Sequence, residues 1–166
     1  PLGPMRSADS PMPEPLDSIS DRLFLHAGAR PETVALTRLK PDGTPAESMN
    51  FRELDRRTRA LAQVLIERGE QGRPVLVPER NGCAYVLGYL ACLRAGAVAV
   101  TAYRPRSTDR SGRLQRIIED ARPSSAFADK ETIEIFANLD QELLPAGSFI
   151  ATDEPHEHAP DHGDLP

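Results

Sequence analysis

Two arginines on either side of a proline are the side chains in this sequence best suited to bind a charged ligand. The segment AYRPR begins at the last residue of the uncharged run AVAVTA and contains Arg104 and Arg106. If that run is a central strand of a parallel sheet, the segment opens at its carboxyl end, where open α/β sheets bind ligands. Tyr103, Arg104 and Arg106 are therefore the candidate substrate-binding residues, with phosphate or carboxylate as the group bound. The alternative is that Pro105 stiffens a loop and that both arginines are solvated.

Histidine is the other residue type that could carry chemistry. His156, His158 and His162 lie among carboxylates near the end of the sequence. This composition can bind metals, but a segment with no predicted element gives the imidazoles neither fixed geometry nor supporting hydrogen bonds, so no metal site is predicted. His26 falls within a predicted helix, with no serine or cysteine in a recognisable nucleophile turn, and is interpreted as a structural residue.

Complete catalytic motifs are missing from the sequence. It contains no G-x-x-x-x-G-K-[ST], no G-x-G-x-x-G and no H-E-x-x-H pattern. Cys83 and Cys92 lie nine residues apart in one apolar tract, on different turns of a predicted helix, so a disulfide is not expected and both are interpreted as small core residues. We therefore predict no catalytic and no cofactor-binding residue in this chain.

Length and charge limit the partners. The chain has 166 residues and a net charge of -5, enough length for one core. Five of its 25 acidic residues lie in residues 151–166, which contain no Lys or Arg, so the remainder carries 20 acidic and 20 basic residues. A neutral body gives no reason to expect nucleic acid or an anionic membrane as a partner. With no apolar run near the roughly 18 residues of a membrane span and no signal pattern, we expect a soluble, cytoplasmic protein.

The sequence divides into three parts. Residues 1–15 are interpreted as a cloning scar, PLGP ahead of Met5, followed by a flexible Pro-rich leader; residues 16–150 as an α/β subdomain; and residues 151–166 as an acidic, His-containing tail or linker. A short amphipathic helix is predicted over residues 16–29, with Asp17 as a possible N-cap and an inward stripe: Ile19, Leu23, Phe24 and Ala27. TVALTRL, the turn KPDGTP and a second extended piece then predict a hairpin.

The next predicted element is a long amphipathic helix between Asn50 and Gly69. Asn50 as N-cap and Glu53 three residues later resemble a capping box, and Gly69 is placed for a left-handed C-cap. Its apolar stripe consists of Phe51, Leu54, Thr58, Leu61 and Leu65.

Short apolar strands then alternate with helices. Strands are predicted at residues 74–77, 97–102 and 125–128, and helices from about 81 to 96, 108 to 121 and 130 to 139. The helix ending at Gly96 carries small side chains on one face, which permits close approach to a sheet: Gly88, Ala91, Cys92 and Ala95. The pattern predicts an α/β fold with an open, mostly parallel sheet, helices on both faces and a short N-terminal hairpin.

These segments, taken in order, resemble a known family. FRELDRRTRALAQVLIERG, PVLV, YVLGYLACLRAGAVAVTAYRPR and RLQRIIEDARPSSAF are similar to the N-terminal part of adenylate-forming enzymes, and within them to the fatty acyl-AMP ligases. The resemblance runs from about Asp17 to Asp129. Thr101 and Arg104 depart from it, because the ligases usually have proline at both positions.

The resemblance implies a parent reaction. Such ligases use ATP and Mg²⁺ to convert a fatty acid into an acyl-adenylate, then load the acyl group onto an acyl carrier protein in polyketide, nonribosomal peptide or lipid biosynthesis. Their phosphate loop and catalytic lysine lie downstream of the segment matched here. The resemblance thus implies an inactive N-terminal fragment with no cofactor of its own, whose partner is the remainder of the adenylation domain.

Two alternatives remain open. A noncatalytic module could keep the ligase-type fold for protein interaction, or the His/Asp tail could make the chain metal-responsive. In the fragment interpretation, apolar surface that the missing part once covered favours self-association.

Overall fold

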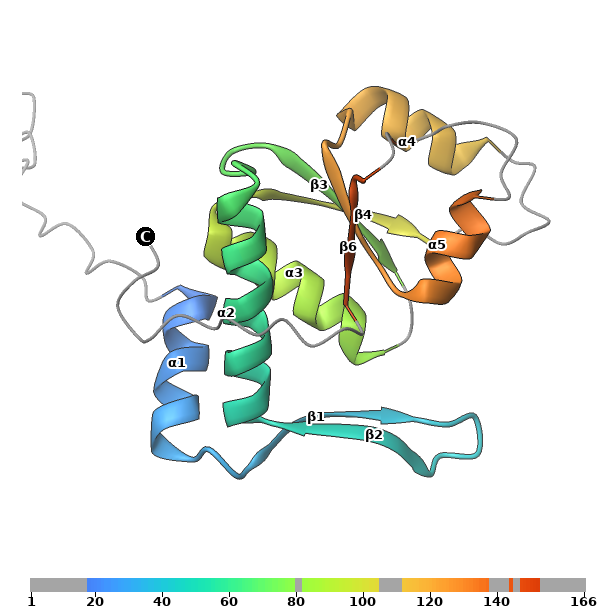
Figure 1. The fold of residues 1–166 in the computed structure, drawn as a ribbon. Helices are drawn as coiled ribbons and strands as arrows, with labels where there is room; N and C mark the ends of the chain where they lie inside the picture. Colours follow the sequence, from blue (N-terminus) through green and yellow to red (C-terminus); the bar gives the residue numbers. More distant parts are fainter. Residues whose placement is uncertain (1–17, 80–81, 105–111, 138–143, 145–146, 153–166) are drawn as a thin grey trace, which may run out of the picture.

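The computed structural model describes residues 18–79, 82–104, 112–137, 144 and 147–152, and Figure 1 shows their arrangement. The predicted Arg106 and the three tail histidines lie outside these residues. Within the described part, no helix is long and apolar enough to cross a membrane.

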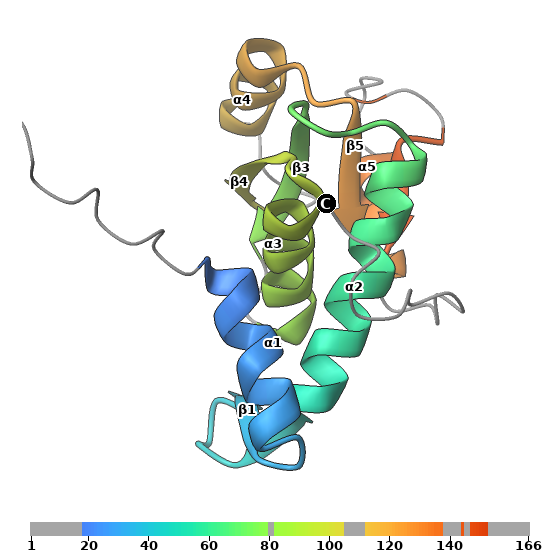
Figure 2. The same cartoon turned by 90° about the vertical axis from the view of Figure 1, so that its left-hand side faces the viewer.

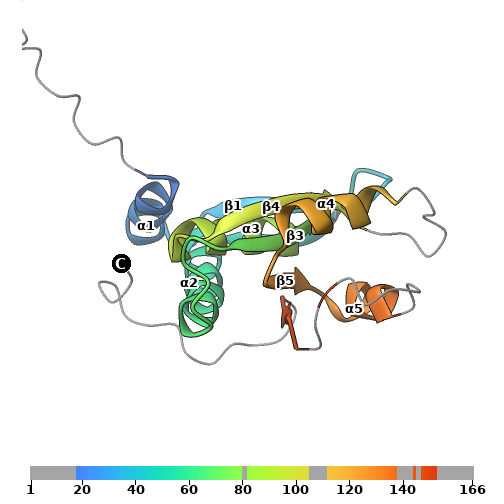
Figure 3. The ribbon, with the colours of Figure 1, turned by 90° about the horizontal axis from the view of Figure 1, so that it is seen from above.

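A four-stranded parallel sheet forms the centre of the fold. Its strands are β3 (Pro74–Glu79), β4 (Val98–Tyr103), β5 (Ser125–Ala128) and β6 (Phe149–Ala151), in the order β4-β3-β5-β6. The prediction of an open parallel sheet is confirmed. The central placement of the strand before AYRPR is wrong, because β4 is an edge strand (Figure 3). β6 was not predicted.

Helices cover both faces of this sheet, as predicted. One core packs α2 (Phe51–Glu67) and α3 (Cys83–Ala95) against the side chains of Val75, Val77 and Phe127. The other core includes side chains of α4 (Arg113–Ala121) and α5 (Lys130–Ala137) together with Leu76 and Ala126. Successive residues of β3 point to opposite faces, so the apolar run PVLV at its start is what this two-sided covering requires.

The small residues of α3 let it approach the sheet closely. Gly88, Ala91, Cys92 and Ala95 are all buried. A Cβ added at Gly88 would lie 3.0 Å from Cδ2 of Phe127 on β5, closer than ordinary van der Waals contact. Gly96 ends the helix, as predicted, and has φ +66° in the left-handed region.

The N-terminal elements pack outside the sheet (Figure 2). α1 (Ile19–Ala29) precedes the antiparallel hairpin of β1 (Val34–Leu39) and β2 (Pro45–Asn50). The predicted hairpin is confirmed, but the α1 N-cap is Ser18, which forms a capping box with Asp21, and not Asp17.

The predicted inward stripe of α1 is wrong in part. Ile19 is 59% exposed and Phe24 is 43% exposed, whereas Leu23 is buried. α1 packs against α2 and, less extensively, α3, with no sheet beneath it, and so it buries a narrow face.

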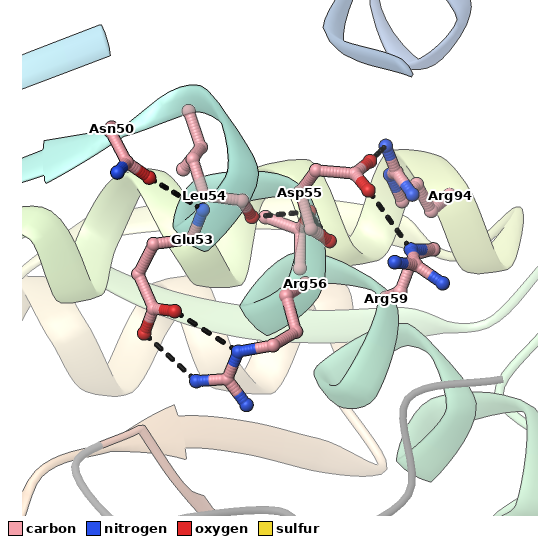
Figure 4. Close-up of polar contacts among 8 residues, drawn as sticks. Asn50, Glu53, Leu54, Asp55, Arg56, Arg59 and Arg94 are labelled. Carbon is pink, nitrogen blue, oxygen red and sulfur yellow. Dashed lines mark hydrogen bonds and ion pairs between the residues drawn. The ribbon is translucent and has the colours of Figure 1, made fainter. Parts of the chain in front are cut away.

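α2 begins and ends as predicted. The Asn50 side chain accepts a hydrogen bond from the Glu53 backbone N–H at 2.9 Å, and Gly69 has φ +70°. Only this half of the capping box forms, because the Glu53 carboxylate accepts two hydrogen bonds from Arg56 (Figure 4).

A buried ion cluster joins α2 to α3. Asp55 is 2% exposed and accepts hydrogen bonds from Arg59 at 3.0 Å and Arg94 at 2.5 Å (Figure 4). A buried carboxylate needs such paired donors, so these arginines are structural.

Candidate functional site

The order of the strands in the sheet changes direction between the parallel neighbours β3 and β5. From the carboxyl end of β3, α3 leads to β4 on one side, and from the carboxyl end of β5, α5 leads to β6 on the other side. In open parallel sheets this switch point leaves a crevice at the carboxyl ends of the two strands, and ligands bind there. The fold therefore selects one location for a site before any side chain is considered.

A hollow is present at that location. β3 pairs with β4 along all six residues but with β5 only at Val75 and Leu76. Pro78 has no N–H to offer β5, so the ladder cannot continue on that side. Where the two strands part, a small hollow of about 20 Å³, open to solvent, is lined by side chains that include Val77, Pro78 and Phe127.

The first turns of α3 and α5, together with Thr152, complete the walls. Ala84 and Tyr85 come from the first turn of α3, which has no side-chain N-cap. Asp129 and Thr132 come from the start of α5, where Asp129 Oδ1 accepts the Thr132 backbone N–H at 2.8 Å. The crevice thus combines apolar walls with a carboxylate that already caps a helix.

Thr152 contributes a buried hydroxyl to the crevice. It is 4% exposed, its backbone N–H donates to Ala128 at 3.2 Å, and its Oγ1 has no hydrogen-bond partner among the described residues. The Arg57 side chain donates to its carbonyl at 3.0 Å and so helps to fix its position. A buried hydroxyl without a partner favours a ligand or water that can bond to it.

The side chains that line the crevice do not fit a nucleoside triphosphate or Mg²⁺. Among the described residues, no three His, Cys, Asp or Glu side chains are grouped to hold a metal. The lining of the crevice contains one carboxylate and no Lys or Arg, so it offers no side-chain cation for the charge of a triphosphate. The crevice therefore offers mostly apolar walls with a few polar groups, and it contains no nucleophile paired with a base.

The candidate residues from the sequence lie elsewhere at the same edge of the sheet. Arg104 forms an ion pair with Glu131 of α5 at 2.8 Å, and its Nε is buried without a hydrogen bond. Tyr103 is 64% exposed, and the guanidinium carbon of Arg113 lies 5.2 Å from its ring centre. Neither residue lines the crevice, and whether they bind substrate stays a prediction, as it does for Arg106.

The cysteines and His26 have structural surroundings. Burial, followed by the Glu47 carboxylate, raises the pKa of Cys83 to about 11, and burial raises the pKa of Cys92 to about 12. Both thiols are free and stay protonated at neutral pH, so neither is an activated nucleophile. His26 lies 5.0 Å from Phe51, ring centre to ring centre.

Sequence inspection missed the crevice residues Asp129, Thr132 and Thr152. Asp129 carried a usable signal, since an Asp directly after a strand and three residues before a threonine marks a helix N-cap at a carboxyl end. Thr152 carried none, because β6 itself was not predicted.

Comparison with known proteins gives the family. The family described as AMP-binding enzyme matches residues 23–163, most of the chain. The chain belongs to this family. A medium-chain fatty-acid–[acyl-carrier-protein] ligase of Teredinibacter turnerae is 22% identical over 129 residues, covering 78% of this chain and 20% of the ligase. A medium/long-chain fatty-acid–[acyl-carrier-protein] ligase of Mycobacterium tuberculosis is 39% identical over 92 residues, covering 55% of this chain and 16% of the ligase.

Solved structures agree with this assignment. A fatty acyl-adenylate ligase from Legionella pneumophila, in complex with acyl adenylate and pyrophosphate, matches with a TM-score of 0.72 and 26% identity, over 84% of this chain and 24% of that one. The chain spans about a fifth of the length of the curated relatives that it matches. The similarity to fatty acyl-AMP and acyl-carrier-protein ligases is therefore partial and covers one segment of them.

Proposed function

We propose that this chain is the N-terminal segment of an enzyme that activates a fatty acid with ATP as the acyl-adenylate and loads it onto an acyl carrier protein. The family match over residues 23–163, together with relatives that are ligases for acyl carrier proteins, carries this proposal. A role in polyketide, nonribosomal peptide or lipid biosynthesis belongs to the same proposal.

The segment's own contribution is structural. Its crevice lacks the cations and metal ligands that stabilise charge during adenylation, so ATP and Mg²⁺ are bound by residues outside it. The apolar side of the crevice, formed by Val77, Ala84 and Phe127, suits the wall of an acyl-chain pocket. The isolated chain is therefore expected to be inactive.

Two measurements test this. The isolated chain, incubated with ATP, Mg²⁺ and a fatty-acid panel, should give no acyl-adenylate, and clear product would contradict the assignment of the active groups to other residues. The gene should be sequenced beyond Pro166, because a Thr/Ser/Gly-rich phosphate loop in the same frame is expected. A stop codon there would favour the noncatalytic interaction module instead.

The acyl-wall role has its own test in the longer polypeptide. Ala84 is partly buried in the crevice lining, so Ala84→Phe should shift the preferred acyl chain to shorter lengths. Gly28→Ala, at a helical position with nothing within 4 Å of the added methyl, is the control and should leave the chain-length profile unchanged.

A further inference from the structure

Two arginines of α2 bind the backbone on either side of β6. At the start of the strand, the Arg68 side chain donates to the carbonyl oxygens of Gly147 at 3.1 Å and Phe149 at 3.3 Å. Directly after the last strand residue, the Arg57 side chain donates to the carbonyl oxygen of Thr152 at 3.0 Å. α2 therefore holds β6 at both of its ends.

The spacing of the two arginines matches the length of the strand. Arg68 is the C-cap residue of α2 and is still in helical conformation, so eleven helical steps separate it from Arg57. Eleven residues make close to three turns, which places both side chains on one face of α2, about 16 Å apart along its axis. Gly147 and Thr152 are separated by about 16 Å of extended chain. One face of the helix can thus bind both ends of β6 at once.

β6 needs these contacts because it is short and lies at the edge of the sheet. It has three residues, and among the described residues it pairs with β5 alone. Its end is held to β5 by the bond from Thr152 N–H to the Ala128 carbonyl, at 3.2 Å. The ends of elements with so few bonds open readily. The bond from Arg57 therefore has a large share in keeping Thr152 in place.

The position of Thr152 matters because this residue lines the crevice. Its side chain is 4% exposed, and its Oγ1 has no hydrogen-bond partner within the described part of the chain. No bond of its own fixes the hydroxyl, so its location follows from the backbone to which Arg57 donates. Arg57 lies outside the lining of the crevice as the structure describes it, and it can affect a bound molecule only through Thr152.

We propose that Arg57 is a positioning residue of the crevice, which acts by holding the Thr152 hydroxyl in the wall that contacts the acyl substrate. Arg68 fixes the opposite end of the same strand. The inference rests on the proposed function, because the acyl-wall role of the crevice is what gives Thr152 a substrate to contact. A hydroxyl held in place binds its partner without first having to be ordered, so the loss of Arg57 weakens substrate binding and not the chemical step.

Thiol labelling tests the positioning without any substrate. In the complete polypeptide that the gene encodes, Thr152→Cys places a thiol of similar size at the buried position. Adding Arg57→Met, which keeps an unbranched side chain but removes the donors, should speed alkylation at position 152 at least tenfold, as measured by peptide mass spectrometry. If that variant does not fold, Arg57→Gln replaces it.

Two controls separate local release from general loosening. Thr132→Cys places the thiol in the same crevice but on α5, where the side chain is 3% exposed, and Arg57→Met should change its labelling less than twofold. Arg56→Met removes the neighbouring exposed arginine, which binds Glu53, and should change labelling at neither position.

Kinetics of the same polypeptide test the effect on binding. Arg57→Met should raise KM for the fatty acid at least fivefold and change kcat less than twofold, and Arg57→Lys, which keeps a cationic donor, should recover part of that loss. Thr152→Val should raise KM in the same way. The double variant should show no more than the larger single effect, because both changes remove the same hydroxyl contact.

Each arm has a result that overturns the proposal. Labelling at position 152 that does not respond to Arg57→Met, or that rises equally at position 132, excludes the positioning role. Multiplying KM effects of Arg57→Met and Thr152→Val, or a fall in kcat at unchanged KM, excludes action through Thr152. A polypeptide that adenylates no fatty acid contradicts the proposed function instead, and the labelling result then decides whether Arg57 holds Thr152.

Discussion

Replacing Gly88 with alanine has two opposite effects on the free energy of unfolding: a gain in helix propensity and a steric clash with Phe127. Alanine in a helix interior is favoured over glycine by about 0.5–1 kcal/mol, because glycine loses more backbone entropy on folding. At Gly88, however, the new Cβ would lie 3.0 Å from Cδ2, 3.1 Å from Cγ and 3.3 Å from Cβ of Phe127. Relief of these contacts must come from Phe127 or from a shift of α3.

Neither can move freely. Phe127 is 2% exposed, and its Cβ is fixed by the β5 backbone, so the ring cannot turn into solvent. Overpacking of this kind costs about 1–3 kcal/mol. The net expectation is that Gly88→Ala lowers the free energy of unfolding by about 1 kcal/mol, which corresponds to a fall in Tm of about 2–4 °C for a chain of this size.

Urea denaturation followed by circular dichroism is the assay, and Gly28→Ala is the matched control. Gly28 lies inside α1 with nothing within 4 Å of an added Cβ, so alanine there should stabilise by about 0.5–1 kcal/mol. In a Phe127→Leu background a flexible aliphatic side chain replaces the rigid ring. At least half of the loss in free energy of unfolding caused by Gly88→Ala should then disappear. If Gly88→Ala stabilises as much as Gly28→Ala, the close approach of α3 to β5 is not what requires glycine.

Three further outcomes are expected. Asp55→Asn should lower the free energy of unfolding by about 2–4 kcal/mol in urea denaturation, because Arg94 is left buried opposite a neutral group. Cys83 and Cys92 should resist alkylation at pH 8 and react on unfolding, because their pKa values of about 11 and 12 keep them protonated; mass spectrometry counts the labels. The hydrogen bonds from Ser18 lower the pKa of Asp21 below its ordinary 3.8, so its contribution to α1 is present above that value and is lost as the pH falls through the lower folded value; a residue-specific NMR titration checks this.

The helices and their packing could be predicted because their signals are local. Asn50 and Gly69 bound α2 through cap geometry that depends on a few neighbouring residues, and Gly88 and Ala91 lie on one face because helical periodicity places them there. A parallel sheet followed from the alternation of apolar strands with helices, which leaves few connections possible.

The order of the strands could not be predicted in the same way. AVAVTA is uncharged whether it forms a central or an edge strand, so nothing within β4 shows that the second neighbour is missing. β6 has three residues, and it is held by β5 and by Arg68, about 80 positions earlier in the chain. Both features depend on contacts between distant segments, which no local pattern encodes.

The crevice was hidden for a related reason. Its walls come from Pro78, Asp129 and Thr152, which belong to three strand ends that meet only once β3 and β5 are neighbours. The sequence did indicate the carboxyl edge of the sheet, but through Arg104. That residue follows β4, which lies next to β3 on the side away from the crevice.

Three buried or partly buried carboxylates of the described residues have structural partners. Asp55 is bound by two arginines, and Glu70, at the amino ends of the strands, accepts hydrogen bonds from Ser124 and Ser125. Asp129 caps α5. These buried or partly buried carboxylates are thus committed to holding elements together, since an unpaired one would be costly. The hollow at the switch point is lined by apolar side chains together with Tyr85, Thr132, Thr152 and Asp129, and its lining contains no Lys or Arg that could stabilise the charge of adenylate formation. If this segment is one wall of a larger adenylating enzyme, as proposed, groups outside the described residues supply that charge.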